Sequence, residues 1–235
     1  VFLLKVDLGG QPEWARIGAP VGFGFNDGAC GQYIAYRENG DFDIVYSMSS
    51  SDNEIGCGVL RMQSDGTIIS SHGVLNILSL GQMTNARLGA VCTSMDNGFY
   101  VAMKEAPYNG TSGLSGLMLG RYDSLGTLLW WRFYPIEGIG DYTNGSIVMS
   151  AKSGGGATVA INDISAHYLL AVDPGGTVLW KRSFATGSPV LALRGSPGDG
   201  TLMFQSRMFP EPTGRQVVAT MLDSTSGEAL WVKFL

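Results

Sequence analysis

The chain contains 235 residues, of which 45% are apolar and 15% charged, so it is long enough to bury a sizeable core. No segment reaches ~18 continuous apolar residues, so we expect no membrane span. A net charge of −5 and a pI near 4.9 argue against a nucleic-acid partner, which requires a basic surface.

Residues 1–18 predict a single β-hairpin. An apolar run is followed by a turn from Asp7 to Gly10 and then by a second strand that carries Trp14. The chain begins at Val1 rather than at a methionine and shows no signal or transit segment there. We therefore expect that processing or truncation produced this terminus.

Residues 19–75 predict two strands followed by a hairpin. After a turn-rich segment, strands are expected at 32–38 and 42–48, and apolar residues alternate with Asp43 and Ser47 in the second of them. A polar loop at 49–54 precedes the hairpin at 58–72. This order returns three times, with strand pairs at 88–94 and 99–105, 147–152 and 157–161, and 190–194 and 201–205. Each pair leads into another hairpin.

The hairpin itself is the repeated motif, and residues 168–184 give its clearest copy, YLLAVDPGGTVLWKRSF. Asp173 and Pro174 favour the turn, and a glycine supplies its positive φ. The five turn glycines, Gly10, Gly66, Gly126, Gly176 and Gly227, are spaced by 56, 60, 50 and 51 residues. Four copies carry an aspartate (Asp7, Asp123, Asp173, Asp223) and a tryptophan (Trp14, Trp130, Trp180, Trp231). The second copy has Gln63 and Ser70 instead.

Four-stranded antiparallel units repeated at this interval predict an all-β fold, namely a β-propeller. We expect four full blades, at 19–75, 76–134, 135–184 and 185–235, after a leading half blade at 1–18. A parallel β-helix is the competing architecture, but its coils are shorter and lack tight hairpins. The four tryptophans should occupy equivalent, largely buried places between blades, with Ser70 at the corresponding place in the odd one.

Four and a half blades do not close evenly, so residues 1–235 are expected to form one propeller region of a longer chain or array. The first strand, at 2–6, would leave one edge of its backbone unpaired. We expect that edge to be paired by upstream residues of the same polypeptide or by a neighbouring subunit.

The pattern of an apolar strand, an aspartate, a turn glycine and a tryptophan resembles the tryptophan motif of quinoprotein-like propellers, which include bacterial outer-membrane assembly factors. The segments LLKVDLGGQPEWARIG and DNGFYVAM are more similar still to repeats of secreted bacterial propellers, often found in large surface proteins. The resemblance covers almost the whole chain. It implies a fold but no single activity, because this superfamily ranges from enzymes to passive scaffolds.

Few residues suggest chemistry. The two histidines, His72 and His167, lie at strand ends in different repeats, and no known catalytic motif is present. The Gly-rich segments at 22–28 and 153–157 are interpreted as turns, because no helix follows them. The three cysteines (Cys30, Cys57, Cys92) lack metal-ligand spacing and are interpreted as buried small residues, with one disulfide as the alternative.

Two loop regions carry residues typical of surface sites, one for a cation and one for glycans. Asp52, Asn53 and Glu54 share one loop but offer too few oxygens for calcium unless backbone carbonyls and water complete the shell, so we expect solvated loop charge. Asn109 and Asn144 each begin an N-glycosylation acceptor pattern in a predicted loop. Asn-Gly is also a favoured turn dipeptide, and occupancy is left open.

The sequence therefore predicts a non-enzymatic scaffold, adhesion or protein-interaction module, at the cell surface, secreted or in the periplasm. Its expected partners are other protein chains or further repeats of the same chain, including self-assembly. No catalytic, cofactor-binding or metal-binding residue is assigned, no cofactor is expected, and no hydrolase or dehydrogenase turnover should occur. The alternative is a quinoprotein-like enzyme with a site in its central channel, for which Arg37, Lys152 and Arg194 offer an anion-binding ring.

Overall fold

The structure is a computed structural model whose described part is entirely β-strand, turn and loop. It describes residues 2–17, 29–37, 39–49, 55–76, 87–94, 96–105, 116–136, 146–163, 166–184, 188–196, 198, 200–208 and 214–235. Across these ranges no helix is long and apolar enough to cross a membrane. The chain divides into two compact units, Val1–Met83 and Thr84–Leu235.

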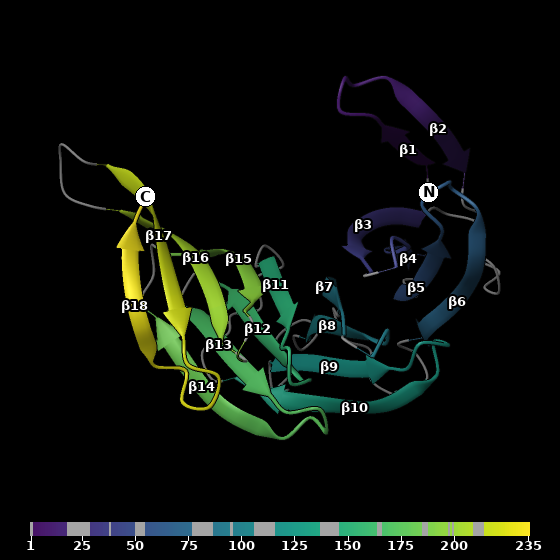
Figure 1. The fold of residues 1–235 in the computed structure, drawn as a ribbon. Coiled ribbons are helices and arrows are strands. Elements are labelled where there is room, and N and C mark those ends of the chain that lie inside the picture. Colours follow the sequence, from purple (N-terminus) through teal and green to yellow (C-terminus); the bar gives the residue numbers. More distant parts are fainter. Residues whose placement is uncertain are drawn as a thin grey trace. The chain divides into compact units, whose positions relative to one another are not determined.

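The first unit contains a hairpin and a four-stranded sheet, both antiparallel (Figure 1). The hairpin pairs β1 (Phe2–Val6) with β2 (Pro12–Ile17). The sheet pairs its strands in sequence order: β3 (Ala29–Tyr36), β4 (Phe42–Ser49), β5 (Ile55–Met62) and β6 (Ile68–Asn76).

Side chains of the hairpin pack directly on this sheet. Leu3 joins a buried cluster with Phe42, Ile44 and neighbouring residues of β5, and Trp14 packs against its edge. The Trp14 and Phe42 rings are stacked, with centroids 6.0 Å apart and planes inclined by only 6°. The hairpin therefore behaves as the second half of a preceding sheet.

The second unit contains three antiparallel sheets with the same sequential strand order. The first comprises β7 (Arg87–Thr93), β8 (Phe99–Glu105), β9 (Gly116–Tyr122) and β10 (Leu128–Pro135). The second comprises β11 (Ser146–Ala151), β12 (Ala157–Asn162), β13 (His167–Val172) and β14 (Val178–Phe184). The third comprises β15 (Val190–Gly195), β16 (Thr201–Met208), β17 (Arg215–Leu222) and β18 (Ala229–Phe234).

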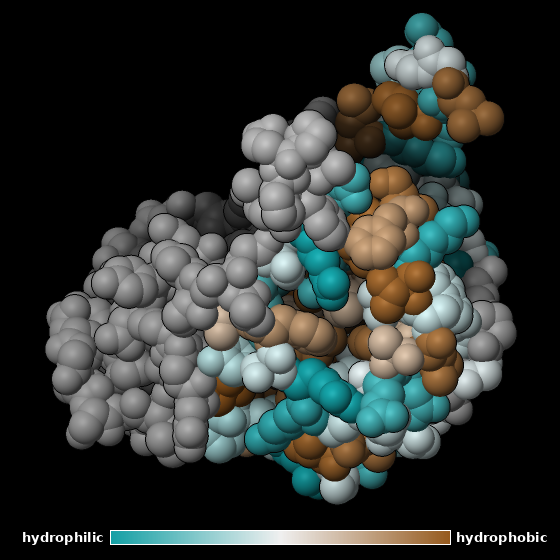
Figure 2. All heavy atoms as spheres, turned by 90° about the vertical axis from the view of Figure 1, so that its left-hand side faces the viewer, coloured by the Kyte–Doolittle hydropathy of each residue, from teal (hydrophilic) through white to brown (hydrophobic). Residues whose placement is uncertain are grey.

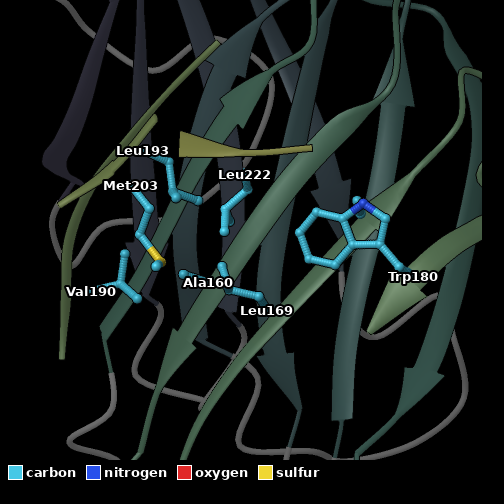
Figure 3. Close-up of a cluster of buried hydrophobic side chains, with 8 residues drawn as sticks. Ala160, Leu169, Trp180, Val190, Leu193, Met203 and Leu222 are labelled. Carbon is cyan, nitrogen blue, oxygen red and sulfur yellow. The ribbon is translucent and has the colours of Figure 1, made fainter. Parts of the chain in front are cut away.

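These sheets pack face to face, with their first strands as neighbours. β11 contacts both β7 and β15. Between the second and third sheets, Leu169 and Trp180 meet Met203, Leu222 and other apolar side chains in one buried cluster (Figure 3). Four-stranded antiparallel sheets that bury both faces in this way fit a propeller-like all-β fold.

The predicted order of strands and hairpins is confirmed, although some strands are longer than predicted. The hairpin predicted at 58–72, for example, extends from Ile55 to Asn76. In β14 the apolar run ends at Trp180, whereas the strand continues to Phe184. Lys181, Arg182 and Ser183 are exposed, so apolar character ends before the backbone pairing does. The hydrophobic pattern therefore locates a strand better than its end.

Each repeated hairpin has the same irregular register. The turn glycines Gly10, Gly66, Gly126, Gly176 and Gly227 all have positive φ, as a glycine that follows a tight turn and forms a bulge requires. A register shift then follows, which pairs Trp14 with Lys5, Trp130 with Arg121, Trp180 with Ala171 and Trp231 with Met221. In the second copy, Ser70 pairs with Arg61.

The tryptophans are thus equivalent in register, but they differ in burial. Trp180 is 7% exposed, and Trp14 and Trp130 are half-buried. The prediction that all four are largely buried is wrong for Trp231, which is 45% exposed. Trp180 belongs to the buried cluster between the second and third sheets, whereas Trp231 is not a member of that cluster.

Replacing Trp180 by Ala should lower the free energy of unfolding by ~3–5 kcal/mol, because it leaves a cavity between two sheets. Trp231→Ala is the matched control, since it removes an indole from the same register position at an exposed site. Its cost should be below about 1 kcal/mol. Urea denaturation at low protein concentration measures both, and equal losses would contradict the assignment of Trp180 to an inter-sheet core.

Candidate functional site

The sheets are joined by a repeated contact in which a tryptophan of one sheet enters the hairpin turn of the next. The indole N–H of Trp14 donates to the Ser64 carbonyl at 3.1 Å, that of Trp130 to Pro174 at 3.0 Å, and that of Trp180 to Ser224 at 3.0 Å. Each acceptor directly follows the first residue of its turn. We call this arrangement the tryptophan–turn contact.

A cation donates to the same carbonyl in every case. Lys5 Nζ lies 3.2 Å from the Ser64 oxygen and Arg121 Nη1 lies 2.9 Å from that of Pro174. Both cations pair across the hairpin with the tryptophan that shares their acceptor. Each turn carbonyl thus uses both of its lone pairs, one for a neutral donor and one for a charged donor.

The third contact obtains its cation from elsewhere. Ala171 pairs with Trp180, so no cation is available at that position of the strand. Instead Lys152, in the turn between β11 and β12, donates to the Ser224 carbonyl at 3.2 Å. Lys152 is buried, so it has the geometry of a structural donor rather than of a solvated strand-end residue.

Glycine is required where the indole lies on the turn. A Cβ atom at Gly66 would lie 2.9 Å from the Trp14 indole, and one at Gly227 would lie 2.6 Å from that of Trp180. Real Cβ atoms do not approach carbon so closely, so a larger residue would force the sheets apart. Gly66, Gly176 and Gly227 are accordingly buried.

Gly176 receives further contacts from the preceding sheet. The Tyr134 hydroxyl donates to the Gly176 carbonyl at 2.6 Å, and burial raises the pKa of Tyr134 to about 12. Arg132 also lies against this glycine, and Arg182 donates at 3.1 Å to Ser226 beside Gly227. A cation two residues after the tryptophan therefore reaches the next turn, and the sequence repeats it as Arg16, Arg132, Arg182 and Lys233.

The third sheet carries the same tryptophan face without a cover. By strand alternation and register, Trp231 shares this face with Ala192, Phe204, Val217 and Met221. Ala192, Phe204 and Met221 stand where the second sheet has Val148, Ala160 and Ala171, which pack in the cluster between the second and third sheets. We call these five residues the open face. Val217 is 36% exposed, and Figure 2 shows hydrophobic surface among hydrophilic side chains on the side of the molecule where β18 lies.

A groove of about 770 Å³ lies between the ends of β10 and the outer side of β13 and β14. Its walls include Tyr134, Ile136, Tyr168 and Leu170, and Lys181 adds a cation. The groove is therefore a mainly apolar surface depression with a basic rim.

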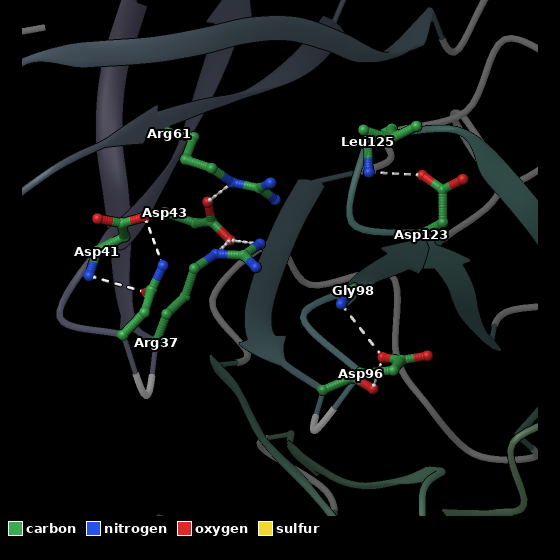
Figure 4. Close-up of polar contacts among 10 residues, drawn as sticks. Arg37, Asp41, Asp43, Arg61, Asp96, Gly98, Asp123 and Leu125 are labelled. Atoms are coloured by element: carbon green, nitrogen blue, oxygen red, sulfur yellow. Dashed lines mark hydrogen bonds and ion pairs between the residues drawn. The ribbon is translucent and has the colours of Figure 1, made fainter.

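Arg37, Lys152 and Arg194, which the sequence suggested as an anion-binding ring, differ in their contacts and exposure. Arg37 is buried and donates from Nε to Asp43 at 2.9 Å, while Arg61 Nε donates to the other Asp43 oxygen at 3.0 Å (Figure 4). Lys152 serves the Ser224 carbonyl, and only Arg194 is exposed. Two of the three cations are therefore engaged in structural contacts.

The structure describes only some of the other residues that were considered as metal ligands, reactive groups or glycosylation sites. Among the described residues no group of three or more His, Cys, Asp or Glu could hold a metal ion. Cys92 is free and buried, and burial raises the pKa of its thiol. The side chains of His72, Cys30 and Cys57 lie outside what the structure describes, as do Asp52, Asn53, Glu54, Asn109 and Asn144.

The tryptophan–turn contact was only partly visible in the sequence. The tryptophan and the glycine were identified, but the cation on the shared carbonyl was missed. A signal exists for it, because Lys5 and Arg121 each stand two residues before the turn aspartate. Ala171 breaks this pattern, which hides Lys152 from any rule based on spacing alone.

No known protein family and no curated protein sequence matches the chain. Among solved structures, the chain is similar to a protein of unknown function from Bacteroides caccae, with a TM-score of 0.50 and 11% identity over 100% of this chain and 93% of that one. A luciferin-regenerating enzyme (TM-score 0.45, 8% identity, coverage 87% and 76%) and a streptogramin B lyase (0.35, 8%, 86% and 80%) also match. At 11% identity, the similarity to the Bacteroides caccae protein is evidence about the fold alone. The resemblance to quinoprotein-like repeats stays a prediction.

Replacing Asp43 by Asn should lower the free energy of unfolding by ~3–5 kcal/mol, because two adjacent guanidinium groups would lose their shared carboxylate in a buried site. Asp41→Asn is the control, since Asp41 lies only two residues away, in a turn where its carboxylate accepts from Asn39. Chemical denaturation compares the two variants. Similarly small decreases in the free energy of unfolding for both variants would show that the ion pairs of Asp43 contribute little to stability.

His167 should make stability fall in mild acid. It is buried, and neither ring nitrogen has a hydrogen-bond partner. Burial lowers its pKa below 6.5, against a smaller opposite effect of Asp163. Protonation therefore favours the unfolded chain, so stability is complete above pH 6.5 and decreases as the pH falls below it.

His167→Leu should flatten the pH dependence of the melting temperature between about pH 5 and pH 7. His72→Leu provides the comparison, because it removes the other histidine. A slope that disappears in the His72 variant and persists in the His167 variant would contradict this assignment.

Proposed function

We propose that the protein is a non-enzymatic scaffold whose open face binds other protein chains. The observation that carries the proposal is the contrast between Trp180 and Trp231, which share one register position but are 7% and 45% exposed. An indole at this register position supplies the donor of the tryptophan–turn contact, which Trp14, Trp130 and Trp180 each form with a turn of the same chain. Exposed apolar surface of this kind marks an interaction site.

The composition of the open face supports binding of protein rather than of a small polar ligand. Its tryptophan and methionine are residue types enriched at protein interfaces. Lys233, two residues after Trp231, occupies the place from which Arg182 reaches the neighbouring turn. The face thus combines a large apolar anchor with a cation at its rim.

The engagement of Arg37 and Lys152 in structural contacts supports a role without catalysis. We propose four complete blades after a leading half blade, located outside the cytoplasm as a secreted or cell-surface protein or in the periplasm. The low fraction of charged residues and the abundance of glycine are the features of the sequence that favour this placement.

A hairpin peptide tests the binding face. The probe is a backbone-cyclised peptide of residues 168–184 with Trp180→Phe, so that the indole signal comes only from the protein. We expect saturable binding that changes tryptophan fluorescence and is lost in Trp231→Ala, because the peptide turn supplies both the acceptor carbonyl and the glycine.

The matched control is the same peptide with Gly176→Asn, whose side chain would collide with the indole while tolerating positive φ. Its binding should be lost. Absence of saturable binding, or equal binding by wild type and Trp231→Ala, would refute the open face as a binding site.

A further inference from the structure

We propose that the open face of one molecule receives the β1–β2 hairpin of a second copy, so that the chain associates head to tail. This inference rests on the proposed function, because it takes the open face to be a binding surface. It adds the identity of the partner and the segment that is bound. Two independent features of the hairpin support it.

The first feature is an empty tryptophan–turn site. The turn from Asp7 to Gly10 has the backbone hydrogen bonds of the occupied turns at 63–66 and 173–176, because Asp7 N donates to the Gln11 carbonyl at 2.9 Å and Gly10 N donates to the Asp7 carbonyl at 3.0 Å. Gly10 has φ +80, yet a Cβ atom there would meet nothing within 4 Å. By position the Leu8 carbonyl corresponds to those of Ser64, Pro174 and Ser224. This turn therefore offers everything that an indole requires.

The second feature is an exposed apolar side on the same hairpin. The register places Val6 where the third sheet has Leu222, which is 3% exposed because it packs against the second sheet. Val6 is 47% exposed and Leu4 is 52% exposed. The hairpin thus exposes the surface that the third sheet uses to cover the second.

These two surfaces are complementary halves of one repeated contact. Docking would place Gly10 under Trp231, the Leu8 carbonyl on its indole N–H, and Val6 on the apolar side chains of the open face. Because the two surfaces differ, the association is heterologous and can continue from copy to copy.

The open face lacks one element of the internal contacts. Met221 stands opposite Trp231, where Lys5 and Arg121 stand opposite their tryptophans, and Ser196 occupies the turn position of Lys152. The turn carbonyl would therefore receive one donor from these positions rather than two. The association should accordingly be weaker than the internal contacts, and reversible.

Sedimentation velocity over a range of concentrations tests the proposal with the full 235-residue chain. The mean mass of wild type should rise with concentration. Trp231→Ala and Gly10→Asn should each weaken association about thirtyfold or more, as loss of an interface hot spot does. Asn tolerates the positive φ of Gly10, so that variant should fold normally while its side chain blocks the indole.

Gly40→Asn is the matched control, because Gly40 also has positive φ and open space around it but belongs to a turn that receives no tryptophan. It should associate like wild type. A mixture of Trp231→Ala and Gly10→Asn should form a 1:1 heterodimer and nothing larger, since only one pair of intact surfaces remains.

Wild type that is monomeric at every concentration would overturn the proposal, as would association unchanged in Gly10→Asn or a mixture that stays monomeric. The hairpin peptide separates this failure from failure of the proposed function. If the peptide binds through Trp231 but the chain does not self-associate, the open face stands as a binding site and the second copy is not its partner.

Discussion

The arrangement of the sheets depends on a hydrogen bond from a side chain of one sheet to the backbone carbonyl of the next turn. A backbone carbonyl is present whatever the residue, so Ser64, Pro174 and Ser224 serve equally well. The contact instead restricts which residue can be the donor and how large a residue can stand beside the acceptor carbonyl. Tryptophan brings a donor on a large apolar ring, and glycine allows that ring to approach.

A cation donates to the turn carbonyl in all three contacts, although it does not come from the same position of the repeat in each. Two contacts take it from the strand opposite the tryptophan, as Lys5 and Arg121, and the third takes Lys152 from a turn of the first strand pair. A charged donor strengthens a hydrogen bond, and a buried lysine needs such a partner. This explains why Lys152 is buried, although its position at a strand end suggests a solvated residue.

Much of the fold could be predicted from the sequence, because strand alternation, turn chemistry and a regular repeat are local signals. The positions of Trp14, Trp130, Trp180 and Trp231 followed from the repeat and were equivalent in register. Burial could not be predicted in the same way, since it depends on what covers a residue. Trp231 has the local sequence of Trp180 but is 45% exposed, compared with 7% for Trp180. The buried Arg37–Asp43–Arg61 group was missed for a similar reason, because Arg37 lies in the turn after β3 while Asp43 and Arg61 are partners on β4 and β5.

The tryptophan–turn contact permits wide sequence variation, because few of its atoms belong to variable side chains. Differences between one contact and another therefore lie in the residues around it. A contact made through a carbonyl and a glycine constrains few side chains, so a likeness of fold at 11% identity along the whole chain is compatible with it. The residues free to vary are those around the contact, and the open face illustrates the effect. Met221 replaces a cation there, so the face loses a charge-assisted hydrogen bond and gains a flexible apolar side chain. Each internal contact has a cation and an indole on its turn carbonyl, whereas the proposed contact at the open face would have the indole alone.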